Sequence, residues 1–591
     1  MRTAPGLLLL STLLLAATHA QAAAPSVVKP GSLSPHLREA TDLGLAPLSE
    51  SHAVVVGLAL RNRDDLEAFL QELQDPTSPN YHRFLTQEEF NERFGPRPED
   101  EQAVVDHLQS NGLEITDRFS NRLIVGARGN VGAIERAFGV RLHAVRLKGA
   151  RHFAALEEPR IPASLAPVVV GVIGLDDLSE MHPHLRGGTP TAAPNASLGS
   201  NCCSFSPNDL RTFYDGSTGF DGTGQTIVIA GAFAWKDSDN TGFNTQWSLP
   251  PLPAGSGQIC TGIIFKSACK FSNQNSLEIA LDVEYAHGTA PGAVILNYMA
   301  GTTTFASFAT MYNRVVSDNP GHVVSTSWGG CESSLSTSTQ TSDDNIFANA
   351  NAIGQSWFAA SGDNGSRDCG TSVVTVDHPA NSPHVIGVGG TTAACSGGMT
   401  PSSPACAGYG SETAWSGSGG GISNVFARPT WQTGCGVPGG STRLVPDVAL
   451  EADTTPGNYV LENGSWYIVG GTSDAAPQWA GFWTQLNQKT GGSGLGNPGP
   501  LLYSLCGTPA LRDIISGSNG DYSAGPGYDL VTGLGTINAK NLIAPSQESV
   551  PALSSRGVAI LALLGAAFMV LRRKRAPDLK QRSADEASRS T

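Results

Sequence analysis

The second half of the chain alternates short apolar segments with segments of helical periodicity. We expect strands at residues 226–230, 294–299, 322–327, 356–360 and 384–388. We expect helices near residues 276–287, 304–316 and 341–353. This alternation predicts an α/β fold, with a mostly parallel sheet covered by helices on both faces. On such sheets catalytic side chains gather at the carboxyl ends of the strands.

Residues 33–180 form a different block, with charged helices and no cysteine. A strand is expected at 54–60 and a helix at 64–73, and Thr86 with Glu89 fits a capping box that begins a second helix. Two more helices and a strand are expected at 98–113, 131–138 and 140–147. Because strands and helices do not alternate strictly, this block is predicted to be a compact α+β domain. It contains no catalytic candidate.

A stretch rich in Gly, Pro, Thr and Ala follows this domain, from residue 186 to residue 200. Such a composition is typical of an exposed linker, which is a natural place for proteolytic cleavage. We therefore assign residues 181–200 as a linker and processing region, and residues 201–545 as the catalytic domain.

All ten cysteines lie beyond the linker. In an exported chain, an even number confined to one domain indicates disulfides. The pairing cannot be derived from the sequence, and Cys260/Cys269 and Cys395/Cys406 are candidates because they are close along the chain.

Both ends of the chain carry targeting features. Residues 1–22 are typical of a secretory signal peptide, with Arg2 before an apolar core and a cleavage motif that ends at Ala22. Residues 550–575 contain an apolar run that ends in a basic cluster, which predicts a membrane anchor or a sorting signal, and residues 576–591 form a polar tail. We expect an exported protein at the cell surface or outside the cell, tethered to the membrane through this C-terminal segment.

The charge balance favours operation in acid. Residues 198–545 hold 24 Asp and Glu against 11 Lys and Arg. At low pH the carboxylates become neutral and few positive charges remain to repel one another, which limits acid unfolding. The same balance argues against nucleic acid as a partner.

A candidate nucleophile stands in the sequence Gly470-Gly471-Thr472-Ser473, just before Ala-rich helical sequence. This order places Ser473 on a tight turn at a helix start, where its hydroxyl can be exposed and backbone N–H groups face a developing anion. In a chain with 69 glycines such a triplet also arises by chance. The serine therefore needs a base supplied by another part of the chain.

Two bases are available upstream. Glu278 and Asp282 are four residues apart, so they lie on one face of a predicted helix. If they approach each other they share a proton, and the pair can deprotonate a serine in acid, where imidazole is already protonated. A solvated helix face is the plainer interpretation. The other base is His287, in a His-Gly-Thr sequence similar to that of subtilisin-type proteases, but the strand at 226–230 is not followed by the Asp which that arrangement needs.

Asp363 is the third candidate, because it directly follows an apolar strand in the sequence Ser361-Gly362-Asp363. An ionised carboxylate only accepts hydrogen bonds, so Asp363 can donate to an oxyanion only while it keeps its proton. Such a site works at low pH. An ordinary turn is the alternative interpretation of this sequence.

Together these motifs resemble the sedolisin family, the serine-carboxyl peptidases, over nearly the whole chain between signal and anchor. The shared motifs include residues 325–329, 361–363, 379–383, 446–448 and 471–473. The resemblance implies a subtilisin-like catalytic domain preceded by a pro-kumamolisin-type propeptide that acts as an intramolecular inhibitor. It implies Ser473 as nucleophile, Glu278 as base, Asp282 as the partner of Glu278, and Asp363 as oxyanion donor. Substrates are then proteins and peptides, cut by endopeptidase or tripeptidyl-peptidase activity.

The resemblance also implies one structural Ca²⁺ ion. Its ligands are the carboxylates of Asp513 and Asp529 with the carbonyls of Ile514, Gly525 and Gly527, an all-oxygen set that suits calcium. Without the resemblance this segment reads as a glycine-rich turn.

Two other functions remain to be weighed. One is a histidine-based subtilisin that uses His287. The other is a catalytically inactive, surface-displayed homologue that serves as a binding module. The presence of Glu278, Asp282, Asp363 and Ser473 together argues against the second, because binding alone does not need all four.

Overall fold

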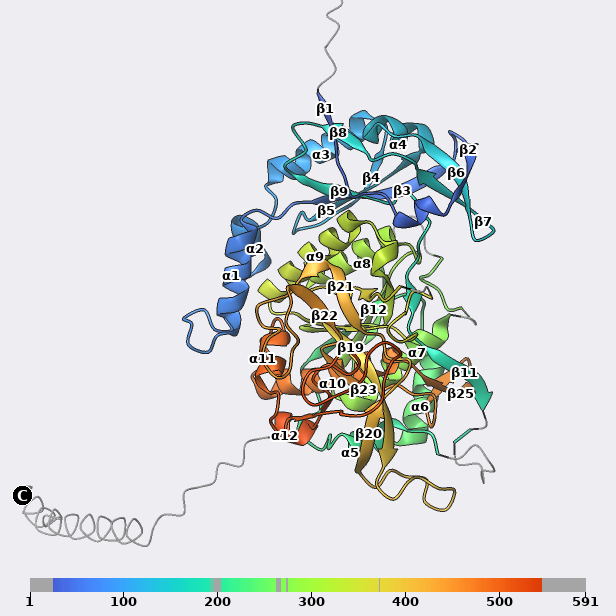
Figure 1. Cartoon of the computed structure of the whole chain (residues 1–591), viewed down its shortest axis with the longest axis vertical. Coiled ribbons are helices and arrows are strands. Elements are labelled where there is room, and N and C mark those ends of the chain that lie inside the picture. Colours follow the sequence, from blue (N-terminus) through green and yellow to red (C-terminus); the bar gives the residue numbers. More distant parts are fainter. Residues whose placement is uncertain are drawn as a thin grey trace, which may run out of the picture. The chain divides into compact units, whose positions relative to one another are not determined.

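An eight-stranded sheet forms the centre of the second half of the chain (Figure 1). The computed structural model describes residues 25–191, 193–194, 203–261, 267–272, 275–370 and 373–544. The strands of this sheet are β12 (Thr226–Gly231), β13 (Gly257–Cys260), β14 (Val294–Met299), β15 (Val323–Thr326), β17 (Ser356–Ala360), β19 (Ile386–Cys395), β20 (Tyr409–Ala414) and β23 (Val448–Glu451). Their order is β13-β14-β12-β15-β17-β19-β20, and β23 also pairs with β19.

The pairing confirms the predicted α/β fold. Neighbouring strands run parallel at every pairing except that of β19 with β20. The five predicted strands all form. We did not predict the edge strand β13, because its sequence Gly-Gln-Ile-Cys has little apolar content. Its pairing with β14 depends on tertiary contacts.

Helices cover both faces of the sheet, and the alternation of side chains along β12 shows why. Ile227 and Ile229 pack into a core with α7 (Ser276–Thr289) and α10 (Thr472–Lys489). Val228 and Ala230 point the other way, into a core with α8 (Phe305–Asp318) and α9 (Thr337–Ala352). Successive residues of a strand face opposite sides, so one apolar run serves two helical layers.

The N-terminal block is the predicted α+β domain. An antiparallel sheet of order β4-β5-β3-β9 is formed by β3 (Ser51–Leu58), β4 (Glu114–Arg118), β5 (Ile124–Asn130) and β9 (Val169–Ile173). Helices α3 (Pro98–Ser110) and α4 (Val131–Phe138) pack on it. The predicted capping box of Thr86 and Glu89 begins α2 (Gln87–Arg93), as expected.

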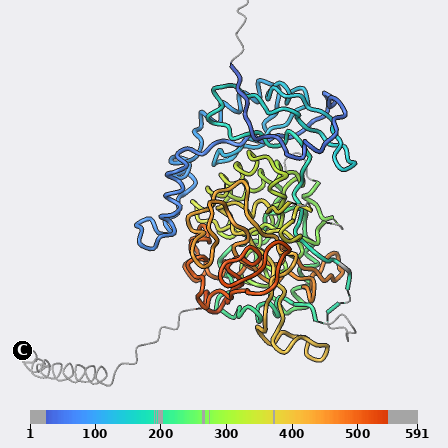
Figure 2. Tube along the Cα trace, viewed as in Figure 1, coloured from blue at the N-terminus to red at the C-terminus, as the bar shows by residue number. Residues whose placement is uncertain are grey.

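The two domains share a hydrophobic core. On β3, Val54 and Val56 face the domain's own helices, whereas Val55 belongs to the core that includes α8 and α9. A buried amide contact accompanies this packing, since Asn121 Nδ2 donates to Asn313 Oδ1 at 2.7 Å. The helical layer of the catalytic domain therefore covers the second face of the N-terminal sheet (Figure 2).

Helix α1 (Arg63–Gln74) adds a charged contact between the domains. Arg63 pairs with Asp344 of α9 at 2.8 Å and with Glu67 at 2.7 Å, and His384 pairs with Asp344 at 2.8 Å and with Glu67 at 3.4 Å. Burial alone would lower the pKa of His384, but the charges of Asp344 and Glu67 outweigh burial and raise it to about 9. The imidazole therefore stays protonated at neutral pH, and the four groups form a closed network of opposite charges.

The linker segment is more ordered than its composition suggests, because it contributes two short strands. Its assignment as a linker and processing region stays a prediction. β10 (His182–Pro183) pairs with β16 (Trp328–Cys331), and β11 (Arg186–Thr191) pairs with β25 (Ser465–Gly470). The side-chain composition suggested a loop, whereas the backbone groups find partners on strands of the catalytic domain. Residues 192 and 195–202 lie outside the described part.

Disulfides join described cysteines in four pairs: Cys260–Cys269, Cys331–Cys369, Cys395–Cys406 and Cys435–Cys506. The two candidate pairs named from the sequence are confirmed. No helix in the described ranges is long and apolar enough to cross a membrane. The predicted signal peptide and the predicted C-terminal anchor lie outside those ranges, so both stay predictions.

The ion network between the domains predicts a stability effect confined to the precursor. In a Ser473→Ala background, Arg63→Ala should lower the stability of the precursor by about 1–3 kcal/mol, because it leaves the buried Asp344 with one partner fewer. Differential scanning calorimetry should show a lower melting temperature for this variant. The control is Gln71→Ala, an exposed position on the same helix. Equal melting temperatures for the two variants would contradict the role given to this network.

Candidate active site

Ser473 is the second residue of α10, directly after a glycine turn. Gly471 has a φ of +113°, and a Cβ there would lie 2.3 Å from the His184 carbonyl oxygen and 2.6 Å from Asp363 Oδ2. Both the conformation and the space therefore require glycine. The expected tight turn is present, but Ser473 is fully buried rather than exposed, and its N–H donates to the His184 carbonyl at 3.0 Å.

Helix α7 brings the two candidate bases to this serine. It packs closely against α10, where a Cβ on Gly481 would lie 2.6 Å from Thr289 Cβ. Glu278 and Asp282 both lie on α7 and are 2% and 1% exposed. They are therefore not on a solvated helix face. Glu278 lies near the Ser473 hydroxyl, and Asp282 lies near Glu278.

The burial of this pair changes its titration. Burial raises the pKa of Glu278 well above its usual range, and the charge of Asp282 raises it further. Nearby Ser473 and Ser327 hydroxyls lower the pKa of Glu278 but do not offset the burial. Burial also raises the pKa of Asp282, to about 8. Two buried carboxyl groups this close hold at least one proton at neutral pH.

Ser327 connects the carboxylate pair to the nucleophile. Its hydroxyl donates to Asp282 Oδ1 at 2.6 Å and to the Ser473 carbonyl at 3.3 Å. The Ser473 hydroxyl in turn donates to the Ser327 carbonyl at 3.4 Å. Sequence reasoning assigned no role to Ser327, because its neighbours in space are far from it along the chain. Its position directly after β15, at the carboxyl edge of the parallel sheet where site residues gather, was the available signal.

Asp363 follows the carboxyl end of β17 and contacts Thr472, the residue before Ser473. Its Oδ1 accepts hydrogen bonds from the Thr472 N–H at 2.8 Å and the Thr472 hydroxyl at 2.9 Å. Its Oδ2 has no hydrogen-bond partner among the described residues and is buried. Burial raises the pKa of Asp363 to about 6, although the charge of His184 opposes this rise. A protonated Oδ2 can donate to an oxygen beside Gly471.

The rings of His287, His378 and His384 have partners away from Ser473. The ring of His287 bonds through Nε2 to the Pro250 carbonyl at 2.7 Å, and burial lowers its pKa. His378 contacts Asp343 at 3.1 Å, and His384 belongs to the interdomain ion network. These contacts place the rings of His287, His378 and His384 outside a serine–histidine pair with Ser473.

The residues predicted to hold calcium come together in one loop region. Asp513 Oδ2 accepts from the Gly527 N–H at 2.8 Å, and Asp529 Oδ2 accepts from the Gly525 N–H at 3.2 Å. Within the described ranges, the carbonyls of Ile514, Gly525 and Gly527 accept no hydrogen bond. Two carboxylates and three uncommitted carbonyls around one glycine-rich loop form an oxygen set that fits Ca²⁺.

Residues 38–178 match the model of the pro-kumamolisin activation domain, and residues 168–495 match the model of the subtilase family. The sequence is 32% identical to sedolisin of Pseudomonas sp. (strain 101), over 86% of this chain and 89% of that protein. The chain belongs to the sedolisin family.

Other relatives agree with this membership. Kumamolisin of Bacillus sp. (strain MN-32) is 32% identical over 84% of this chain and 92% of its own length, and mouse tripeptidyl-peptidase 1 is 27% identical over 85% and 92%. The solved structure of Pseudomonas sedolisin, a serine-carboxyl proteinase in complex with pseudo-iodotyrostatin, superposes with a TM-score of 0.52 at 30% identity. It covers 60% of this chain and 99% of that one. This sedolisin-family chain is thus a serine-type peptidase made as a zymogen with an intramolecular propeptide.

The hydrogen bond from Ser327 to Asp282 predicts a pH effect. This bond favours the charged form of Asp282 and lowers its pKa, so Ser327→Ala should raise the pKa of the carboxylate pair. The acid limb of the pH profile for peptide hydrolysis should then move to higher pH. The matched control is Ser325→Ala, a buried serine on β15 whose hydroxyl has no partner among the described residues. An unmoved limb for Ser327→Ala, or the same shift for both, would show that the bond does not tune the pair.

Proposed function

We propose that this sedolisin-family chain is an exported, acid-active peptidase that cuts peptide bonds through an acyl-enzyme on Ser473. The observation that carries the proposal is the buried group of three carboxyls, Glu278, Asp282 and Asp363, around that serine. A histidine-based mechanism finds no support, because the His287 ring is hydrogen-bonded to the Pro250 carbonyl. A pure binding role does not explain why the carboxyl groups are buried beside a serine.

Each side chain has a role that its surroundings favour. Glu278 takes the proton of the Ser473 hydroxyl as that oxygen attacks the substrate carbonyl. Asp282 shares the proton of the pair and, held by Ser327, keeps Glu278 in place. On the other side the Ser473 N–H and the protonated Asp363 Oδ2 donate to the oxygen that becomes negative. The N-terminus of α10 adds a favourable dipole at the same point.

Operation in acid follows from Asp363. A carboxyl with a pKa of about 6 donates a hydrogen bond below that pH and loses its proton as the pH rises through about 6. The oxyanion then faces a negative charge instead of a donor. The excess of acidic over basic residues in the catalytic domain supports the same working range, because few positive charges repel one another at low pH.

Export and calcium complete the proposal. The four described disulfides are typical of an oxidising compartment outside the cytosol, which supports the predicted signal peptide.

One structural Ca²⁺ would be held by Asp513, Asp529 and the carbonyls of Ile514, Gly525 and Gly527. When bound, the ion would tie the glycine-rich loop to the segment of Asp513 and stabilise the folded domain.

Substitution of Asp363 tests the oxyanion role. Asp363→Asn keeps a donor at every pH. The activity that this variant retains should therefore fall less above about pH 6 than the activity of the wild type does. Asp363→Ala removes the donor and should lower kcat by about 10²–10³-fold. Steady-state peptide hydrolysis between pH 3 and 8 measures both effects. Equal activities for the Asn and Ala variants, with an unchanged profile, would remove Asp363 from the mechanism.

Calcium binding is tested by thermal unfolding. The melting temperature of the wild-type protein should rise with added calcium, because the ion binds only the folded state. Asp529→Ala should abolish this dependence. Asp521→Ala is the matched control, since Asp521 is an exposed acid nearby that pairs with Arg367. A wild-type melting temperature that ignores calcium, or a control that loses the response, would contradict the proposed site.

A further inference from the structure

A small antiparallel sheet brings together one imidazole and two carboxyl groups from three separate segments. Its order is β10-β16-β18, in which β18 is Asp377–His378. Strand β16 lies in the middle and pairs with both of the others. His184 directly follows β10, and Asp377 lies on β18 opposite Cys331 of β16. The sheet therefore places His184 and Asp377 on either side of one strand.

A disulfide brings the third group to the same strand. Asp368 directly precedes Cys369, and the Cys331–Cys369 disulfide joins that residue to the end of β16. The carboxylate is also held from the other side, because Asp368 Oδ1 accepts the Asp363 N–H at 2.8 Å. All three segments are thus fixed to β16 or to the loop beside it. Groups held by rigid elements in this way are typical of a binding site.

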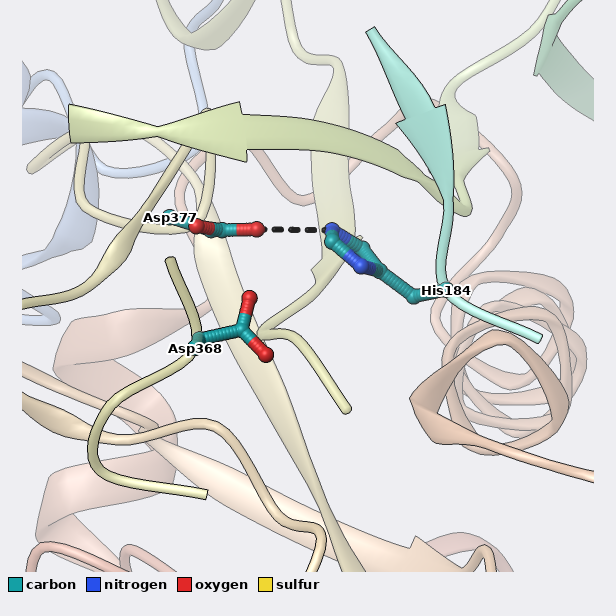
Figure 3. Close-up of side chains that lie close together, drawn as sticks. All are labelled: His184, Asp368 and Asp377. Atoms are coloured by element: carbon teal, nitrogen blue, oxygen red, sulfur yellow. Dashed lines mark ion pairs between the residues drawn. The ribbon is translucent and has the colours of Figure 1, made fainter. Parts of the chain in front are cut away.

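The three side chains point toward one another (Figure 3). His184 Nε2 lies 3.1 Å from Asp377 Oδ2. One ligand atom from each of His184, Asp368 and Asp377 can be chosen so that all three lie within 4.8 Å of one another. In the part of the chain that the structure describes, no other three His, Cys, Asp or Glu side chains come together in this way. The group therefore differs from the other ion pairs of the molecule.

Burial leaves one oxygen of this group in need of a partner. His184, Asp368 and Asp377 are all buried, and Asp377 is only 3% exposed. Asp377 Oδ1 makes no hydrogen bond to any described residue. A buried carboxylate oxygen without a partner is costly, so a cation that binds this oxygen would be stabilising.

Two glycines leave room beside the ligand atoms. A Cβ at Gly329, on β16, would overlap His184 Nε2, and a Cβ at Gly362 would overlap Asp368 Oδ2. Any larger residue at either position would displace a potential ligand. The backbone therefore approaches both ligand atoms as closely as glycine permits.

The donor set selects the kind of ion. Calcium takes oxygen ligands, whereas an imidazole nitrogen together with carboxylate oxygens suits Zn²⁺ and related divalent transition ions. Two carboxylates and a neutral imidazole would balance the charge of such an ion, which makes its burial acceptable. Ligands about 2.0–2.2 Å from zinc lie about 3–4 Å from one another, so small side-chain rotations would close this group onto an ion.

We propose that His184, Asp368 and Asp377 bind one divalent transition-metal ion, of which Zn²⁺ fits best, and that this ion fastens residues 182–191 to the catalytic domain in the precursor. When the ion binds, it replaces the protons that the three groups otherwise hold. The site is separate from the proposed calcium loop, which offers only oxygen atoms. The proposal does not depend on catalysis by Ser473.

Zinc binding is tested on the full-length precursor that carries Ser473→Ala. The protein is stripped of metal, saturated with calcium and titrated with Zn²⁺ at neutral pH by calorimetry. One ion should bind per chain, and the melting temperature should rise with zinc. His184→Leu and Asp377→Asn should each weaken binding by about tenfold or more, because loss of an outer-shell partner alone costs about 10–100-fold. The control is His143→Leu, which removes an imidazole paired at the surface with the single acid Asp42 and should leave zinc binding unchanged.

A cysteine at position 184 tests direct ligation. A thiolate is a good ligand for zinc and for cobalt, so His184→Cys should keep binding. With Co²⁺ this variant should show a sulfur-to-cobalt charge-transfer absorption. His143→Cys is the matched control and should show no such band. The band arises only from a sulfur bound to the metal, so it distinguishes ligation from a general effect on folding.

Three results would overturn the proposal. They are no zinc binding by the calcium-loaded precursor, the same zinc affinity in His184→Leu as in His143→Leu, and no charge-transfer band in cobalt-treated His184→Cys. An ion pair between His184 and Asp377 would then be sufficient to explain the group. None of these results bears on the proposed peptidase, whose failure would be seen as an absence of peptide hydrolysis.

Discussion

The burial of carboxyl groups around one serine is the constraint on which this structure depends. Glu278 and Asp282 are placed by α7, and Asp363 by the end of β17, all within the same buried region. An ionised carboxylate in such a region is costly unless it is paired or protonated. The fold allows both protonation and pairing. In acid the carboxyl groups can take up protons, and in the precursor the cations His184 and Arg186 of the preceding segment lie beside Asp363.

The propeptide contacts the catalytic domain in two ways. Its sheet packs on α8 and α9, and the segment that follows pairs first with β16 through β10 and then with β25 through β11. The N-terminal domain therefore holds the segment in place from a distance, while the segment itself fills the cleft. A segment held in this way blocks other substrates, which is consistent with an intramolecular inhibitory propeptide.

Much of this architecture could be predicted from local sequence. The strands and helices of the catalytic domain could be predicted from hydrophobic periodicity. Thr86 and Glu89 predicted the start of α2, which the structure contains. The sequence also nominated Ser473, Glu278, Asp282 and Asp363, which the structure brings together. It could not reveal the role of Ser327, because this role depends on contacts between distant segments. The docking of residues 182–191 was missed for a different reason: backbone pairing leaves little trace in side-chain composition.

The pH dependence of peptide hydrolysis by the processed wild-type enzyme tests the central claim most directly. Asp363 must be protonated to donate to the oxyanion, and the Glu278–Asp282 pair must keep a site that accepts the serine proton. The account therefore predicts a bell-shaped profile of kcat/KM with its maximum in acid and a decline as the pH rises through about 6. A maximum at neutral or alkaline pH would contradict a mechanism built on buried carboxyl groups.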